Sequence, residues 1–308
     1  MATFAPMMLI FPITFLLLIT IQQSKAALHA HYYDQTCPQA EKIVSETIRN
    51  ASIYDLKVPA RILRMFFHDC FIRGCDASVL LDSTPQNQDF LTNISLGSFY
   101  VMDDAKAKLE KACPHTVSCA DSGEPYWDLL KGRKDGRVSK ASETINLPAP
   151  TFNVTQLIQS FSNRGLSVKD MVALSGGHTL GFSHCSSFES RLRNFSCQHD
   201  IDPSMNLELA RNLRNTCPKP NVDRNAGQVL DSTSSTFDNY YYKQLVVGRG
   251  VFGSDQSLFG DFRTRWIVGA FANNERLFFR EFASSIVRLG SVGVIENGEV
   301  RVKCRVVN

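Results

Sequence analysis

Apolar residues recur along most of this chain with the spacing of helices, and the alternation typical of strands is rare. Positions i, i+3, i+4 and i+7 share one face of an α-helix, so this spacing predicts amphipathic helices. A single segment, EVRVK at 299–303, alternates as a strand does. The pattern therefore predicts an all-α protein, with helices over residues 37–52, 59–71, 99–112, 153–164, 167–175, 205–215, 238–247, 262–273 and 275–289.

Local signals support several of these boundaries. Ser167 followed by Asp170 has the spacing of a capping box at a helix start. Gly290 stands where the last helix is expected to stop. Segments 82–98 and 120–150 are rich in Pro, Gly, Asn and Ser and are predicted to be loops.

The first 26 residues differ from everything that follows. They are mostly apolar and end in Ser24-Lys25-Ala26, a small–any–small cleavage pattern, so we expect a signal peptide over 1–26. No Lys or Arg precedes the apolar run, which leaves an uncleaved anchor as the alternative. The remaining residues 27–308 contain no repeat or low-complexity linker, and we expect them to form a single domain.

Cysteine usage and sequons favour export. All nine cysteines lie after residue 30, and such cysteines pair in oxidising compartments, although the sequence alone does not assign the pairs. The net charge of +3 and the lack of a basic run give no indication of nucleic-acid binding. A secreted glycoprotein is predicted, with N-x-S/T sequons at Asn50, Asn93, Asn153 and Asn194.

Arg64 and His68 stand four residues apart in the otherwise apolar stretch LRMFFHDCFIRGCD at 63–76. On a helix this spacing puts both side chains on one face. A neighbouring cation disfavours protonation of an imidazole, so His68 is expected to stay neutral, as a base must. The alternative is an ordinary amphipathic helix with two solvated polar residues.

A second histidine, His178, follows two glycines in LSGGHTLG. Glycines beside a histidine let the backbone lie close to something flat or bulky. The alternative is a solvated histidine at the end of a helix. The sequence has no HExxH motif and no GxSxG motif, so neither a zinc peptidase nor a serine hydrolase of the α/β type is supported.

Several motifs together resemble the class III secretory plant peroxidases, which are haem enzymes. The resemblance runs from HYYDQTCP at 31–38 to the end of the chain. It implies the plant haem-peroxidase fold, in which a distal and a proximal helical half hold the haem between them. The motifs, in the order of the family, are FFHDCFIRGCDASVLLD, VSCAD, LKGRKDG, NLPAP, LSGGHTLGFSHC, STFDNYYY and GSDQSLF.

The resemblance implies a role for each residue of the two histidine motifs. His178 would be the proximal ligand of haem iron, and Asp255 would accept a hydrogen bond from its other ring nitrogen. On the opposite face, His68 would take a proton from hydrogen peroxide and return it to the leaving oxygen. Arg64 would stabilise the charge that develops, and Phe67 would wall the cavity, unless it serves only in core packing.

Substrates, cofactors and partners are also implied. One haem b and two calcium ions are expected per chain, and the substrates would be hydrogen peroxide and small phenolic donors. Donors would approach the haem edge near Pro148, and Asn93 would orient His68 through a hydrogen bond. We expect a monomer that is secreted to the apoplast or cell wall, with no nucleic-acid partner and no membrane contact after signal cleavage.

Two groups of oxygen donors match the calcium sites of the family. Carboxylate, hydroxyl and backbone oxygens packed into a short segment suit a hard cation. Ser234 is the alternative to Thr233, because Asp231 and Thr233 stand one residue closer together than in well-known family members. The distal candidates are Asp69, Ile72, Gly74, Asp76 and Ser78, and the proximal candidates are Thr179, Asp231, Thr233, Thr236 and Asp238.

The family pattern also implies how the cysteines pair, with Cys197 left over as a free or intermolecular thiol. Asp121 and Arg133 match a buried ion pair of the family. The implied disulfides are Cys37–Cys113, Cys70–Cys75, Cys119–Cys304 and Cys185–Cys217.

The chain departs from the family pattern in three places. The family has an apolar helix after the segment that ends here at Asp121, and this chain runs directly on as SGEPYW. The loop after Asp82 is shorter, and Gly97 replaces a usual arginine. A lost core helix removes stabilisation comparable with the net stability of a domain. The alternative to an active enzyme is therefore a weakened or inactive secreted glycoprotein of the same fold, with a binding or structural role.

Overall fold

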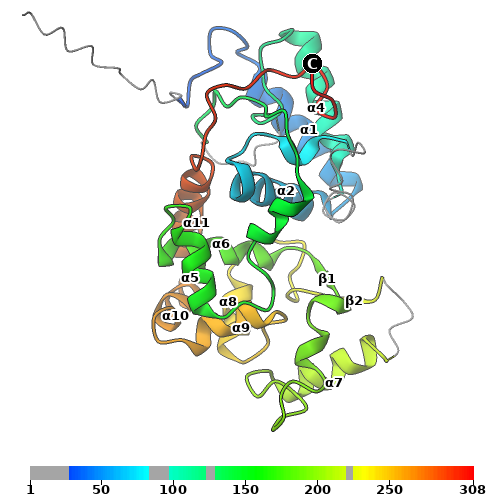
Figure 1. Cartoon of the computed structure of the whole chain (residues 1–308), viewed down its shortest axis with the longest axis vertical. Coiled ribbons are helices and arrows are strands. Elements are labelled where there is room, and N and C mark those ends of the chain that lie inside the picture. Colours follow the sequence, from blue (N-terminus) through cyan, green and yellow to red (C-terminus); the bar gives the residue numbers. More distant parts are fainter. Residues whose placement is uncertain (1–27, 83–96, 123–128, 220–224) are drawn as a thin grey trace, which may run out of the picture.

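The computed structural model describes residues 28–82, 97–122, 129–219 and 225–308. The predicted signal peptide and Asn93 lie outside these ranges. Helices dominate the described chain, as the hydrophobic pattern predicted (Figure 1). Within the described ranges, no helix combines the length and the apolar character needed to cross a membrane.

The N-terminal helices form one group around a shared core. Helices α1 (Ala40–Tyr54), α2 (Val58–Arg73) and α4 (Phe99–Ala112) pack together, with the short helix η1 (Ser78–Leu80) beside α2. The C-terminal segment runs from α11 back to this group, where it ends beside α4 (Figure 1). Apolar side chains at helical spacing form the core, among them Val44, Ile48, Ile62, Met65, Met102 and Leu109.

A second group of helices surrounds a larger, aromatic core. Helix α6 contacts α5, α10 and α11, and α8 contacts α9 and α10. Phe271, Phe278 and Phe282 of this core are almost completely buried. The elements of this group are η2 (Ala141–Asn146), α5 (Val154–Ser162), α6 (Val168–Ser175), η3 (Gly176–Thr179), α8 (Tyr240–Val246), α9 (Gly253–Gly260), α10 (Arg265–Asn273) and α11 (Glu275–Leu289).

A third, smaller core lies under a two-stranded sheet. Strand β1 (Phe182–His184) pairs antiparallel with β2 (Gly227–Val229), with Ser183 opposite Gln228. The Cys185–Cys217 disulfide ties this region to the end of α7. Its remaining elements are η4 (Cys185–Ser187), η5 (Glu189–Arg191) and α7 (Leu207–Thr216).

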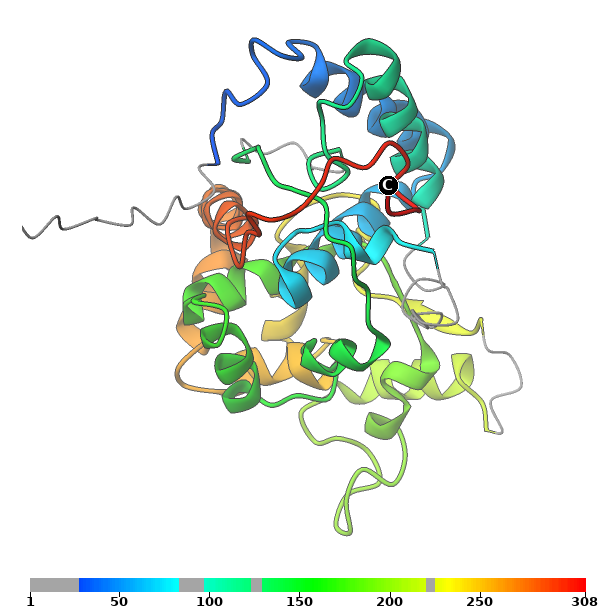
Figure 2. The ribbon, with the colours of Figure 1, turned by 45° about the horizontal axis from the view of Figure 1, so that its top comes forward.

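Helix α2 belongs to both large cores. Ile62 and Met65 pack into the N-terminal core, and Phe66 and Phe71 pack into the aromatic core. Figure 2 shows α2 between the α1–α4 pair and the helices of the second group. A helix buried on two sides is held firmly, so α2 can position polar side chains on its remaining face.

Four elements differ from the sequence expectations. The predicted strand at 299–303 is wrong, because Glu299 forms only an isolated bridge with Asp135. Strands β1 and β2 have three residues each, too few to show alternation. Helix α9 was missed because its sequence, GSDQSLFG, carries no amphipathic stripe.

Polar contacts and disulfides join the residues on either side of 123–128. Asp121 accepts hydrogen bonds from Tyr33 at 2.7 Å and from the guanidinium of Arg133 at 2.9 Å, and both charged side chains are buried. The chain before and after this segment is therefore held together independently of it. The structure forms the four disulfides implied by the resemblance, Cys37–Cys113, Cys70–Cys75, Cys119–Cys304 and Cys185–Cys217, and leaves Cys197 free and exposed.

Candidate active site

Helix α2 places Arg64 and His68 on one face, as the spacing predicted. The helix begins with Pro59 in its first turn, where a missing N–H costs nothing. It ends at Gly74, whose φ of +88° and close approach to Gly293 admit no side chain. Arg64 Nε lies 3.3 Å from His68 Nε2.

This contact assigns the tautomer of His68. A guanidinium can only donate hydrogen bonds, so Nε2 of His68 carries a lone pair and the ring proton is on Nδ1. Burial, together with the charge of Arg64, lowers the pKa of His68 to about 3. His68 is therefore a neutral imidazole whose Nε2 can accept a proton.

The other nitrogen of His68 is unsatisfied. Nδ1 is buried and has no hydrogen-bond partner among the residues that the structure describes. A buried N–H without an acceptor costs about 1–3 kcal/mol, so an acceptor is expected here. Asn93, the acceptor implied by the resemblance, lies outside the described residues.

Phe67 is half-buried and packs in the aromatic core. Its ring stacks on Phe71 with centroids 4.9 Å apart and lies 6.2 Å from Phe161. It also meets the ring of His68 edge-on at 6.3 Å. Phe67 thus packs in the core, which was the alternative to its expected role as a cavity wall, and it also borders His68.

Helix α6 leads directly into the second histidine. The predicted capping box is confirmed: Ser167 Oγ accepts from the N–H of Asp170, and Asp170 accepts from the N–H of Ser167. Gly176 lies so close to Tyr242 and Phe278 that a Cβ would clash with both. The bulky neighbours of Gly176 are therefore core aromatic rings.

His178 on η3 is held by a carboxylate from α9. Its Nδ1 lies 2.9 Å from Asp255 Oδ1, and a carboxylate can only accept, so Nδ1 carries a proton and, in the neutral ring, Nε2 carries the lone pair. Burial would lower the pKa of His178, but the charge and hydrogen bond of Asp255 outweigh it and raise this pKa. The side chain is still 42% exposed, which leaves Nε2 open to a ligand.

Arg64 on α2 and His178 on η3 influence each other electrostatically. Loss of hydration lowers the pKa of Arg64. Its charge also opposes protonation of His178, so the two side chains lie within electrostatic range. Leu63, also on α2, lies next to Gly177.

Tyr241 is a residue of this site that the sequence reasoning missed. Its hydroxyl donates to Asp255 Oδ1 at 2.9 Å, so the same oxygen serves both Tyr241 and His178. The sequence pointed to Tyr241 only through its place in the motif STFDNYYY. The sequence separation between this motif and Asp255 gives no indication that the two residues meet.

The distal group of oxygen donors is assembled around the end of α2. Asp69 accepts from the N–H groups of Ala77 at 2.7 Å and Val79 at 3.2 Å. Asp76 accepts from the N–H of Ser78 at 3.0 Å. Burial and the charge of Asp76 raise the pKa of Asp69. Ile72 and Gly74 lie on the same turn, at the end of α2 and its cap.

The proximal group also converges, directly after His178. Thr179 Oγ1 lies 2.7 Å from Asp231 Oδ2 and 3.1 Å from Asp238 Oδ1. Thr233 Oγ1 lies 3.2 Å from one oxygen of each of the two carboxylates. Thr236 belongs to the same loop, and its N–H bonds the carbonyl of Thr233.

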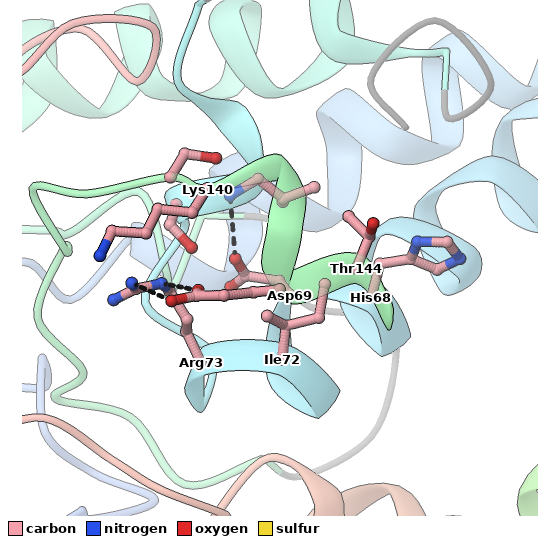
Figure 3. Close-up of a pocket in the computed structure, with 10 residues that line it drawn as sticks. His68, Asp69, Ile72, Arg73, Lys140 and Thr144 are labelled. Carbon is pink, nitrogen blue, oxygen red and sulfur yellow. Dashed lines mark hydrogen bonds and ion pairs between the residues drawn. The ribbon is translucent and has the colours of Figure 1, made fainter. Parts of the chain in front are cut away.

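A small pocket near the end of α2 has His68, Asp69 and Arg73 among its lining residues, together with Glu143 and Thr144 of η2. Figure 3 shows the imidazole of His68 turned away from Asp69 and Arg73. Arg73 binds both oxygens of Glu143, at 2.5 and 2.7 Å, and so ties η2 to the end of α2. Pro148 follows η2, and the same loop bonds α9 through the carbonyl of Pro150 and the N–H of Ser254, at 2.9 Å.

Comparisons with known proteins identify the family. The family model described as peroxidase matches residues 41–274. The chain belongs to the peroxidase family. It is 66% identical to Peroxidase 66 of Arabidopsis thaliana over 316 residues, which cover 97% of this chain and 98% of that protein. Peroxidase 64 of Arabidopsis thaliana is 51% identical over 91% of this chain and 92% of its own length. Peroxidase 5 of Vitis vinifera is 43% identical over 92% of each.

The relatives place this peroxidase among the class III enzymes of plants, as the resemblance indicated. An alignment over 316 positions exceeds the 308 residues of this chain, so Peroxidase 66 has residues at positions where this peroxidase has none. The family implies haem and calcium in general.

The residues of this peroxidase fit a haem. In its neutral form His178 has an Nε2 that can bind iron, and its other nitrogen is fixed by Asp255. His68 offers a second unprotonated Nε2, beside Arg64. The two oxygen clusters also fit hard cations, because each gathers two carboxylates with hydroxyl or carbonyl oxygens.

Proposed function

We propose that this peroxidase is a secreted single-domain enzyme that binds one haem b through His178 and oxidises small phenolic donors with hydrogen peroxide. The observation that carries the proposal is the pair of histidines: Asp255 fixes a proton of His178 on Nδ1, and Nε2 of His68 accepts a hydrogen bond from Arg64. One imidazole is arranged as a ligand and the other as a base. Haem, when bound, supplies the centre that exchanges electrons with peroxide and donors.

His68 provides the proton transfers of peroxide reduction. Its Nε2 takes the proton from one peroxide oxygen and delivers it to the other, which leaves as water. The pKa of about 3 keeps this nitrogen unprotonated at neutral pH, so every molecule begins the cycle with a competent base. Over the full reaction, peroxide takes two electrons and two protons from two phenols and yields two waters.

Arg64 stabilises the oxygen that departs. Its guanidinium lies against His68 Nε2, where negative charge develops as the O–O bond breaks. A donor that is already in place acts strongly on such charge, because it need not reorganise when the charge develops. Arg64 also keeps the pKa of His68 low, so one side chain supports both steps.

Asp255 fixes the orientation and charge of His178. The hydrogen bond at 2.9 Å fixes the orientation of the ring and makes the imidazole a stronger electron donor. We place phenolic donors near Pro148, and Phe67 on the wall beside His68. Asn93 is the proposed acceptor for Nδ1 of His68.

Two calcium ions are part of the proposal. The distal ion would bind at Asp69, Ile72, Gly74, Asp76 and Ser78, and the proximal ion at Thr179, Asp231, Thr233, Thr236 and Asp238. Support comes from the repulsion between Asp69 and Asp76, which a cation would relieve. The proximal ion would brace the residue next to His178.

One experiment tests the central proposal. Residues 27–308 are produced with haem and calcium, the Soret band is recorded, and peroxide-dependent oxidation of guaiacol is measured. A Soret band with turnover is the expected result. Absence of the band would overturn the haem proposal. Metal analysis of the same sample measures how many calcium ions each chain binds. The elution volume of the protein on size exclusion shows whether it is the expected monomer.

The second candidate function is an inactive, haem-binding glycoprotein of this fold. It is favoured by the positions that Peroxidase 66 has and this chain lacks. A normal Soret band without guaiacol oxidation would support it. Sequencing the transcript across 118–127 shows whether the shortened segment belongs to the natural protein.

A further inference from the structure

The carboxylate that supports His178 has a second donor, which comes from a different helix. Asp255 Oδ1 lies 2.9 Å from His178 Nδ1 and 2.9 Å from the hydroxyl of Tyr241. Tyr241 is on α8, Asp255 on α9 and His178 on η3, and α8 contacts both other elements. Asp255 and Tyr241 are 3% and 2% exposed, so little water competes for this oxygen.

The phenol can only serve as a donor in this setting. Burial and the nearby carboxylate raise the pKa of Tyr241 well above its ordinary value, so the hydroxyl keeps its proton. The ring of Tyr241 is held edge-on against His178 at 6.1 Å and against Tyr242 at 4.9 Å. The hydroxyl therefore has little freedom to leave Asp255.

Two donors on one carboxylate oxygen share its negative charge. The hydrogen bond from His178 determines how much imidazolate character the ligand has, and it weakens as the acceptor is satisfied from elsewhere. We propose that Tyr241 is a positioning residue of the proximal site, whose hydroxyl anchors Asp255 Oδ1 and limits the charge that this oxygen transfers to His178. The inference rests on the proposed role of His178 as the haem ligand.

The neighbouring tyrosine provides a matched control. Tyr242 is also fully buried in the same helix, but its hydroxyl donates to the carbonyls of Val172 at 2.8 Å and Ala173 at 3.2 Å. Tyr242→Phe removes the same atom from the same core without touching Asp255. Any effect of Tyr241→Phe beyond that of Tyr242→Phe comes from the bond to the carboxylate.

The test measures the iron–histidine stretching frequency of the reduced holoenzyme by resonance Raman spectroscopy. Tyr241→Phe is expected to shift this frequency upward and to lower the Fe(III)/Fe(II) reduction potential, because Asp255 then transfers more charge to His178. Asp255→Asn supplies the opposite reference, a downward shift. Tyr242→Phe should leave both quantities at the wild-type values.

Each outcome decides one question. If the wild-type holoenzyme has no iron–histidine band, His178 is not the ligand and the proposed function fails. If that band is present and Tyr241→Phe leaves it unchanged or moves it downward, the inference about Tyr241 is overturned. Should Tyr241→Phe not fold, site-specific 3,5-difluorotyrosine at position 241 keeps the ring and strengthens the donor. Its expected shift is downward, and an unchanged or higher frequency again overturns the inference.

Discussion

His68 and His178 share one tautomer but have opposite surroundings. His178 is fixed by Asp255, which also holds Tyr241, and its pKa is raised. His68 has only Arg64 against one nitrogen and no partner for the other among the described residues, and its pKa is lowered to about 3. A ligand must be an electron-rich, oriented donor, whereas a base must be neutral and free to accept a proton.

The difference also separates two halves of the site. We expect the proximal half, around His178, to tolerate changes in sequence, and the distal half, around His68, to be sensitive to them. The hydrogen bonds that hold His178 and Asp255 join residues of α8, α9 and η3. The acceptor expected for His68, Asn93, belongs to the segment after Asp82, which we expect to be shorter than in the family. Changes between this chain and its relatives should therefore affect peroxide reduction more than haem binding.

Replacing the base should have the largest effect. His68→Leu removes the proton acceptor, so the rate constant for reaction with peroxide should fall by about 10²- to 10⁴-fold. The Soret band should remain, because His178 is untouched. Stopped-flow absorbance measures the rate, and His184→Leu on the exposed edge of β1 is the control. An unchanged rate in His68→Leu would show that another residue is the base.

Replacing Arg64 should act in two ways. Arg64→Leu should slow the peroxide reaction by about 10²- to 10³-fold through loss of charge stabilisation. It should also raise the pKa of His68, since the charge of Arg64 is one of the two causes that lower it. The protonated form cannot accept a proton, so the wild-type rate falls only as pH drops through about 3. In the variant this fall should occur at higher pH.

Arg64→Lys separates the two effects. It keeps the positive charge, so the acid limb of the pH–rate profile should stay near the wild-type position. It lacks the planar fork of donors, so the rate should still be reduced. If the acid limb of the pH–rate profile lies at the same pH in Arg64→Leu as in the wild type, burial alone sets the pKa of His68.

The sequence predicted most of the helices, and it singled out Arg64, His68 and His178 as candidate site residues. Long amphipathic segments such as 275–289 matched the observed helix because their apolar stripe packs on the core. The i, i+4 spacing of Arg64 and His68 placed both on one face, since helical geometry alone determines that relation.

The remaining features depend on contacts between distant segments. Helix α9 has no apolar stripe to reveal it, and EVRVK failed as a strand because its only pairing is a single bridge at Glu299. The bond of Tyr241 to Asp255 and that of Arg73 to Glu143 join residues whose sequence spacing has no period. Such pairs follow from tertiary packing, which one sequence does not reveal.

On the proximal side, Asp170 should contribute measurably to stability. It caps α6 and accepts from Arg288 at 2.7 Å and Ser285 at 2.8 Å on α11. Burial alone would raise the pKa of Asp170, but these bonds and those of Ser167 lower it to about 2. The stabilisation is present above about pH 4 and is lost as pH falls through about 2. Asp170→Asn should destabilise by about 2 kcal/mol at neutral pH.

Urea unfolding at two pH values checks this prediction. The stability difference between wild type and Asp170→Asn should be full at pH 7 and shrink at pH 2. Asp104→Asn is the control, because Asp104 forms only an exposed pair with Lys108. A difference that does not change with pH would mean that the ionised form of Asp170 is not what holds α6 to α11.

The smallest expected effect concerns the ion pair that joins the end of α2 to η2, the short helix before Pro148. Arg73 and Glu143 form a two-bond ion pair, and η2, described in full, buries none of its residues. Glu143→Gln should cost less than about 1 kcal/mol of global stability, because the pair is partly exposed. Amide exchange over 139–147 should nevertheless accelerate, and KM for phenolic donors should change, because Pro148 follows η2.

The charge-reversed double variant Arg73→Glu/Glu143→Arg should restore slow exchange over 139–147. The peroxide rate constant should stay at the wild-type value in both variants, because the ring of His68 points away from this pair (Figure 3). Equal slowing of the peroxide step and the donor step would contradict this separation. The ion pair would then support α2 itself, and the sensitivity of the distal half would extend from the loop after Asp82 to η2.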